Sequence, residues 1–115
     1  MNLKMWLKAI QIIPKISKEE WDKLDIISRW LIITRAAVLV MTLTSAVIAG
    51  LLTAIAGHGL FIGWRFTLVI IGLVFAHAAN NLINDLTDFS RGVDKDNYFR
   101  TQYGPQALES GLMQK

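Results

Sequence analysis

Residues 66–96 read FTLVIIGLVFAHAANNLINDLTDFSRGVDKD, an apolar run that ends in amides and carboxylates. No charged residue occurs from Phe66 to Ile83, and none occurs from Ala36 to Gly57. Each run is close to the roughly 20 residues that an α-helix needs to cross a hydrocarbon core about 30 Å thick. We therefore predict an all-α integral membrane protein with two transmembrane helices in a hairpin, embedded in a lipid bilayer.

The composition agrees with a membrane protein. Of the 115 residues, 53% are hydrophobic and only 18% are charged, which is unusually apolar for a soluble domain. The chain contains no cysteine, so disulfides are excluded. The net charge is +3, and the basic residues gather at the two ends without interleaved aromatic residues. This distribution favours contact with lipid headgroups and argues against a nucleic-acid partner.

One face of the second apolar helix becomes polar at its C-terminal end. On a helix of 100° per residue, an arc of roughly 100° holds His77, Asn81, Asn84, Asp85 and Asp88. Carboxylates are unfavourable at a helix C-terminus, where partial negative charge accumulates. A cation would offset that cost, and Mg²⁺ commonly binds one or two carboxylates together with a substrate phosphate. The pattern predicts Mg²⁺ on Asp85 and Asp88, with Asn81 and Asn84 as amide ligands or orienting groups.

Two alternatives remain open for this polar face. The helix end could simply emerge into water, with Asp85 and Asp88 solvated. Polar residues begin at His77, however, where the helix is still expected within the membrane, and polar groups at that depth usually face a cavity or a helix bundle. His77 itself is either a hydrogen-bonded residue between helices or a further ligand.

Amphipathic helices that lie in the membrane interface are expected in residues 1–29. The first covers residues 2–13, which are too short and too charged to span a bilayer. A signal peptide is disfavoured because Lys8 interrupts the apolar stretch and no small-residue cleavage site follows. Pro14 is expected to end this helix, because it cannot donate to a continuing helical hydrogen bond.

A second short helix is predicted over residues 17–28. Ser17 followed by Glu20 forms the pattern of a capping box at its start. Trp21 and Trp30 are expected to act as anchors at the membrane interface, where tryptophan is enriched.

The two spans are predicted at residues 30–56 and 60–88, joined by a short link that contains two glycines. Arg35 falls inside the first span. Its guanidinium either snorkels back to the headgroups or contacts a phosphate. A stripe of small or weakly polar residues on the same helix allows close approach of another helix. The stripe consists of Thr42, Ala46, Ala49 and Thr53.

The distribution of basic residues predicts the topology. Lysine and arginine are frequent before the first span and after the second, whereas the link region carries only Arg65. By the positive-inside rule, both termini are expected in the cytoplasm. Residues 89–115 are predicted to form a cytoplasmic loop followed by a short helix that Pro105 opens.

The sequence resembles the first aspartate-rich motif of the UbiA superfamily of intramembrane prenyltransferases. The pattern N-D-x-x-D is matched by Asn84, Asp85 and Asp88. The following G-x-D (Gly92 and Asp94) and the stretch GPQALESG (residues 104–111) are more similar to the 1,4-dihydroxy-2-naphthoate branch, which serves menaquinone biosynthesis.

The resemblance implies a bundle of about nine transmembrane helices in a bacterial-type cell membrane, of which this chain would be the first third. Two aspartate-rich motifs would hold a polyprenyl diphosphate through Mg²⁺, and the prenyl group would be transferred to an aromatic acceptor. Asp85 and Asp88 would be catalytic, and these two with Asn81 would bind the metal. Substrate contacts are expected from Asn81, Asn84, Arg91, Asp94, Lys95 and Arg100, with Asp96 as a further loop contributor.

The chain departs from the family pattern in its extent. It carries neither the second aspartate-rich motif nor the later spans that would enclose a prenyl chain. We therefore expect an N-terminal fragment (a truncated reading frame, an incomplete gene model or one part of a split protein) that is inactive without the remaining helices. The alternative is a non-catalytic helical hairpin that binds a partner in the membrane through its small-residue faces.

Overall fold

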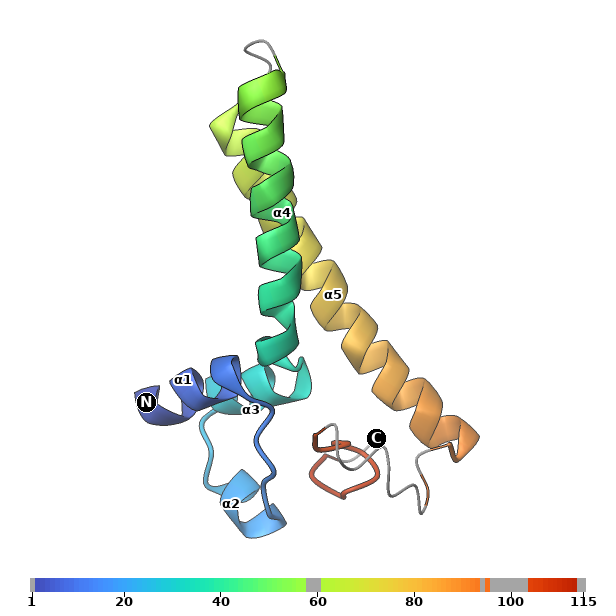
Figure 1. The fold of residues 1–115 in the computed structure, drawn as a ribbon. Coiled ribbons are helices and arrows are strands. Elements are labelled where there is room, and N and C mark those ends of the chain that lie inside the picture. Colours follow the sequence, from blue (N-terminus) through green and yellow to red (C-terminus); the bar gives the residue numbers. More distant parts are fainter. Residues whose placement is uncertain (1, 58–60, 94, 96–103, 114–115) are drawn as a thin grey trace.

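The computed structural model describes residues 2–57, 61–93, 95 and 104–113, and this part of the chain is all-helical. The helices are α1 (Leu3–Gln11), α2 (Lys18–Asp22), α3 (Ile26–Ile33), α4 (Ala36–Ala56) and α5 (Gly63–Arg91). Figure 1 shows two long helices, α4 and α5, that lie close together at one end and diverge toward the other, and three short helices gather at the diverging end of α4.

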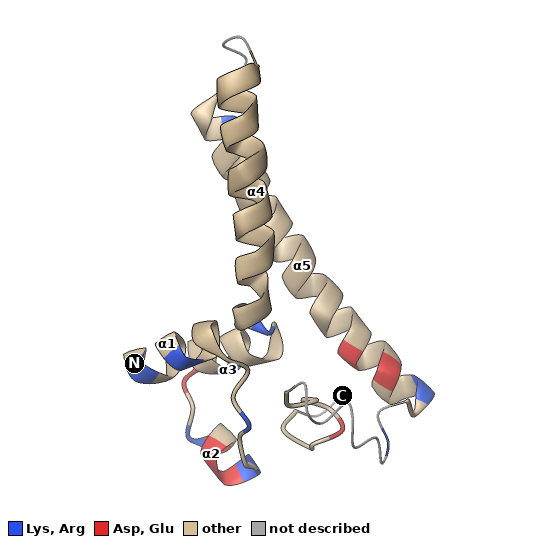
Figure 2. Ribbon diagram, viewed as in Figure 1, with Lys and Arg blue, Asp and Glu red and all other residues tan. Residues whose placement is uncertain are grey.

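Helices α4 and α5 are long and apolar enough to cross a membrane, as the two uncharged runs predict. They run in opposite directions and pack closely near the segment that links them (Figure 1). There, Gly50 on α4 faces the ring of Phe66 on α5, and any larger side chain at this position would require the ring to move. Figure 2 shows that charged residues gather on the short helices and at the C-terminal end of α5.

The first predicted span is interrupted, because α3 ends at Ile33 and α4 begins at Ala36. Between them, Arg35 adopts the left-handed conformation (φ 56°, ψ 55°), which is uncommon for a residue other than glycine. The carbonyl of Trp30 accepts from both the hydroxyl of Thr34, at 2.8 Å, and the backbone N–H of Thr34, at 3.0 Å. A continuous helix over residues 30–56 was the wrong expectation, and Arg35 lies at the break between two helices.

The short helices form a layer with its own small core. Ala9 of α1, Trp21 of α2 and Ile32 of α3 pack with Leu112. Trp21 is only 3% exposed, so it is a core residue of this layer and not the interfacial anchor that the sequence suggested. Trp30 is 37% exposed and meets Phe75 of α5 edge-on.

The local signals for helix ends are largely confirmed. The first helix stops before Pro14, and Ser17 and Glu20 form the predicted capping box, with each side chain accepting from the other's backbone N–H. The second helix is shorter than predicted, however, because α2 ends at Asp22. Asp25 then accepts from the backbone N–H of Ser28 and caps α3.

Acidification should weaken the contact between α1 and α3. Partial desolvation raises the pKa of Asp25, but hydrogen bonds from Ser28 and from the Trp6 indole outweigh it, and the pKa falls from 3.8 to about 2. Because the pKa is lower in the folded state, this stabilisation is present above about pH 4 and is lost as the pH falls toward 2. Trp6 fluorescence should change in this window in the wild type and not in Asp25→Asn. The same titration in both proteins would contradict the assignment.

Residues 104–113 form turns that pack against the short helices, and the helix expected after Pro105 is absent from this segment. The side-chain ammonium of Lys18 donates to the carbonyl of Leu112 at 3.1 Å. Gly104 has φ 122° and lies against the side chain of Ile13. The segment lies between the short helices and the C-terminal end of α5 (Figure 1).

Candidate functional site

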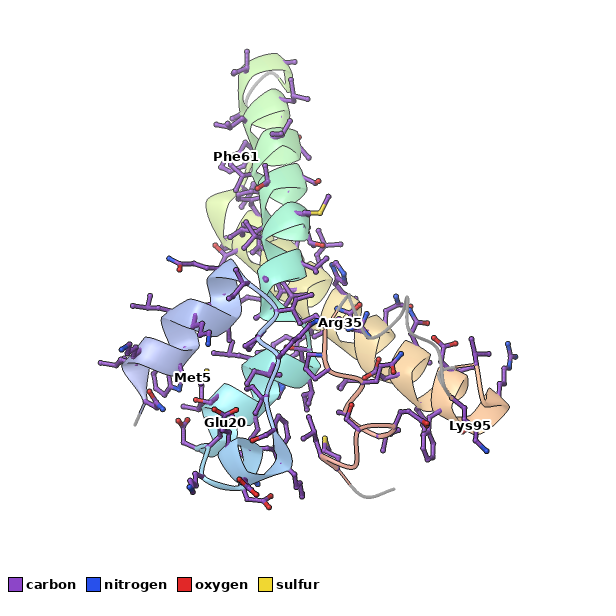
Figure 3. All side chains as sticks on the ribbon, turned by 60° about the horizontal axis from the view of Figure 1, so that its bottom comes forward. Met5, Glu20, Arg35, Phe61 and Lys95 are labelled. Atoms are coloured by element: carbon purple, nitrogen blue, oxygen red, sulfur yellow. The ribbon has the colours of Figure 1, made fainter. Side chains whose placement is uncertain are left out.

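An ion pair joins the polar face of α5 to the break between α3 and α4. The guanidinium Nη2 of Arg35 donates to Oδ1 of Asp85 at 2.6 Å. The Asp85 side chain is 10% exposed and that of Arg35 is 29% exposed, so both are largely shielded from solvent. Figure 3 shows the Arg35 side chain beside α5, at the junction between α3 and α4. Asp85 is therefore an inward-facing residue and not part of a solvated helix end.

The polar face of α5 also stabilises the backbone at this break. Asn81 lies one turn before Asp85, and its side-chain N–H donates to the carbonyl of Thr34 at 2.7 Å. That carbonyl belongs to the end of α3, where helical acceptors lack partners. A left-handed conformation costs roughly 1–2 kcal/mol for a residue other than glycine. The Asn81 hydrogen bond and the Arg35 ion pair offset that cost.

A third segment of the chain reaches the same carboxylate. The backbone N–H of Ala107 donates to Oδ2 of Asp85 at 3.4 Å, a long hydrogen bond in buried surroundings. Both oxygens of Asp85 therefore have donors, one from the α3–α4 break and one from residues 104–113. The Nε of Arg35 is buried and has no hydrogen-bond partner among the described residues. The guanidinium thus keeps an unused donor beside Asp85.

His77 lies two turns deeper on α5 and bridges to α4. Its Nδ1 is 2.5 Å from the hydroxyl of Thr42. This contact confirms the interpretation of His77 as a hydrogen-bonded residue between two helices. Thr42 belongs to the small-residue stripe, so part of that stripe serves the packing of α4 against α5.

The remaining predicted site residues are more scattered. Asp88 is half-buried, whereas Asn84 is exposed at the edge of the polar face. Arg91 and Lys95 are exposed beyond the aspartates, at and after the end of α5. The structure does not describe Asp94, Asp96 and Arg100, so the roles expected of them lie outside the described residues.

Sequence reasoning missed the pairing of Arg35 with Asp85. It considered headgroups and phosphate as partners for Arg35, but not a carboxylate fifty residues further along the chain. A usable signal was present, because both ionisable groups lie at the edge of uncharged runs, where each needs an opposite charge. The Ala107 contact had no such signal, since it is made by a backbone N–H.

The oxygen donors suit Mg²⁺ only if a ligand supplies part of the coordination. Asp85, Asp88 and Asn81 offer the hard oxygens that Mg²⁺ prefers, and Mg²⁺ sites often use one or two carboxylates with phosphate and water. Within residues 2–57, 61–93, 95 and 104–113, no group of three or more His, Asp or Glu side chains is arranged to hold a metal. The described residues therefore do not form a closed protein cage for a metal, and Mg²⁺ at Asp85 and Asp88 stays a prediction that needs ligands from elsewhere.

Comparisons with protein-family models, with curated proteins and with solved structures find no match to this chain. The resemblance carried by Asn84, Asp85 and Asp88 therefore stays a prediction.

Proposed function

We propose that the chain supplies one half of a Mg²⁺-dependent diphosphate site in an intramembrane prenyltransferase of the UbiA type. The enzyme would transfer a polyprenyl group from its diphosphate to an aromatic acceptor in quinone biosynthesis, with menaquinone as the expected product class. The observation that supports this most is the inward-facing carboxylate of Asp85, held between α5, Arg35 and residues 104–113. A polar cluster at the end of a membrane-length helix is costly unless it has a charged partner or ligand.

Each residue has a distinct role in this proposal. Asp85 and Asp88 would hold the metal, with the side-chain oxygen of Asn81 as a further ligand. The bound Mg²⁺ would neutralise the charge of the departing diphosphate. Arg35 would bind a diphosphate oxygen, because its Nη2 lies 2.6 Å from Oδ1 of Asp85 and its side chain is 29% exposed. Arg91 and Lys95 would add positive charge at the cytoplasmic end of α5.

The proposed site needs a second half from further helices. Among the described residues, α4 and α5 are the two helices of membrane length, and they pack along only part of their lengths. Large apolar side chains such as Met41, Ile55 and Phe75 are exposed along both. A long prenyl chain would therefore require additional walls, and a diphosphate would require a second carboxylate cluster. The same surfaces can contact lipid or those further helices.

A second candidate function rests on a different observation. A groove of about 290 Å³ lies where α4 meets α5, and its small residues include Ala46, Ala49 and Gly50. Small residues at such positions allow another transmembrane helix to approach closely. A non-catalytic membrane protein that binds a partner helix in this groove is the alternative.

The two functions differ in their dependence on magnesium. In nanodiscs, the full chain should retain geranylgeranyl diphosphate weakly when Mg²⁺ is present and lose it when the metal is chelated. Asp88→Asn should lower this retention about tenfold or more, because it removes one of two carboxylate ligands. Glu109→Gln is the matched control, since Glu109 is exposed outside the polar face. If retention of geranylgeranyl diphosphate changes neither on chelation of Mg²⁺ nor in Asp88→Asn, the result would contradict the diphosphate site and favour the partner-helix function.

A further inference from the structure

A groove of about 380 Å³ lies away from Arg35 and Asp85, between α2, α3 and residues 112–113. Its apolar lining includes Ile26, Trp30 and Ile33 of α3, together with Met113. The three α3 residues are spaced at i, i+4 and i+7 and therefore share one helix face. Arg29, also on α3, lines the groove as well. The groove thus combines an apolar strip with a single cationic group.

Arg29 is positioned as an anion-binding group. Its Nη2 donates to the carbonyl of Asp22 at 3.0 Å, and its guanidinium carbon lies 5.7 Å from the centroid of the Trp21 ring. These contacts fix the guanidinium plane, while Nε is buried without a hydrogen-bond partner among the described residues. The nearby carboxylate of Asp22 is paired with Lys18 at 3.0 Å. A guanidinium held in this way suits a phosphate oxygen, which can accept from the N–H groups that face the groove.

The apolar strip leads from Arg29 toward the membrane-length helices. Ile26 is 79% exposed, and Trp30 meets Phe75 of α5 with ring centroids 6.5 Å apart. Phe75 is itself largely exposed on α5. A ligand that fits must therefore be anionic at one end and apolar along the other, with its apolar part running toward the region that lipid chains occupy.

We propose that this groove binds one anionic phospholipid, with the phosphate on Arg29 and an acyl chain along Ile26, Trp30 and Ile33. Charge complementarity selects this occupant, because the charged residue that lines the groove is the cation Arg29 and the carboxylate of Asp22 on α2 is already paired with Lys18. A zwitterionic headgroup would bring a second positive charge close to Arg29. The proposal is independent of the diphosphate site, since the two groups of residues do not overlap.

Native mass spectrometry of the full chain, released from micelles with equal phosphatidylglycerol and phosphatidylcholine, tests the proposal. One phosphatidylglycerol should be retained, with about a tenfold preference over phosphatidylcholine, as expected for one well-placed basic residue with charge-assisted hydrogen bonds. A large excess of inorganic phosphate should not displace it, because the acyl chain contributes to binding. Equal retention of the two lipids, or displacement by phosphate, would overturn the proposal.

Variants locate the site. Arg29→Gln should abolish the headgroup preference, and Arg29→Lys should keep only part of it because lysine lacks the planar donor fork. Lys23→Gln is the matched control, since it removes the same charge from an exposed position of the same layer that does not line the groove. Circular dichroism tests whether each variant folds. If Arg29→Gln does not fold, the comparison of phosphatidylglycerol with phosphatidylcholine on the wild-type chain still tests the proposal. An equal loss of preference in Lys23→Gln would show diffuse attraction and overturn the assignment to Arg29.

Discussion

Replacing Asp85 with alanine should lower the free energy of unfolding by about 2–3 kcal/mol. The substitution leaves the guanidinium of Arg35 without its carboxylate and the N–H of Ala107 without its acceptor. Breaking a fully buried ion pair typically costs about 3–5 kcal/mol. We expect less here because the Arg35 side chain keeps 29% of its exposure and can partly reach solvent. Unfolding in mixed micelles measures the effect, and Glu109→Ala serves as the exposed-carboxylate control.

A double variant separates the contribution of the ion pair to stability from that of side-chain packing at the site. Arg35→Met with Asp85→Leu removes both charges and should recover most of the loss caused by Asp85→Ala, because no unpaired charge remains. Recovery should be incomplete, since the backbone N–H of Ala107 still lacks the acceptor that Asp85 provides. If Asp85→Ala is as stable as Glu109→Ala, Asp85 is not held in a shielded ion pair and the description of the site is wrong.

Gly104→Val should release residues 104–113 from the short helices. Gly104 has φ 122°, which other residues rarely adopt, and a side chain there would overlap Ile13. Backbone strain of this kind costs about 1–3 kcal/mol, before the steric overlap is added. Release should also remove the Ala107 hydrogen bond to Asp85 and withdraw Leu112 from its cluster.

Hydrogen exchange measures this release. The amide of Met113, which donates to the carbonyl of Ala107 at 2.9 Å, should exchange at least about tenfold faster in Gly104→Val than in the wild type. Gly111→Ala is the matched control, because Gly111 has φ 64° but open space around it, so it introduces backbone strain without overlap. Unchanged exchange in Gly104→Val would show that the segment does not depend on the Gly104 contact.

The sequence predicts those parts of the fold that local physics determines. Uncharged runs predict the membrane-length helices because every backbone polar group in an apolar medium needs an internal partner, and a helix provides it. Ser17 and Glu20 predict a helix start because two side chains can satisfy each other's backbone N–H groups. Pro14 predicts an end for a similarly local reason. The polar face of α5 follows from helical periodicity alone.

The missed features depend on contacts between distant segments. The break at Arg35 cannot be read from its neighbours, because the strained backbone is compensated by Asp85 and Asn81 on another helix. Trp21 is buried only because α1, α3 and Leu112 surround it. Residues 104–113 are too few to form a stable helix by local propensity, and their packing against the short helices determines their conformation instead.

The predicted joint binding of Mg²⁺ and a diphosphate at Asp85 is tested most directly by paramagnetic broadening. Mn²⁺ accepts the same oxygen ligands as Mg²⁺ and can be added with inorganic diphosphate to the ¹⁵N-labelled chain in nanodiscs. The amide resonance of Ala107, whose nitrogen is 3.4 Å from Asp85, should broaden, while that of Ala54, roughly 28 Å along α4 from the break, should not. The broadening should disappear in Asp85→Asn. An Ala107 resonance that stays sharp in the wild type would contradict a metal–diphosphate site at this carboxylate.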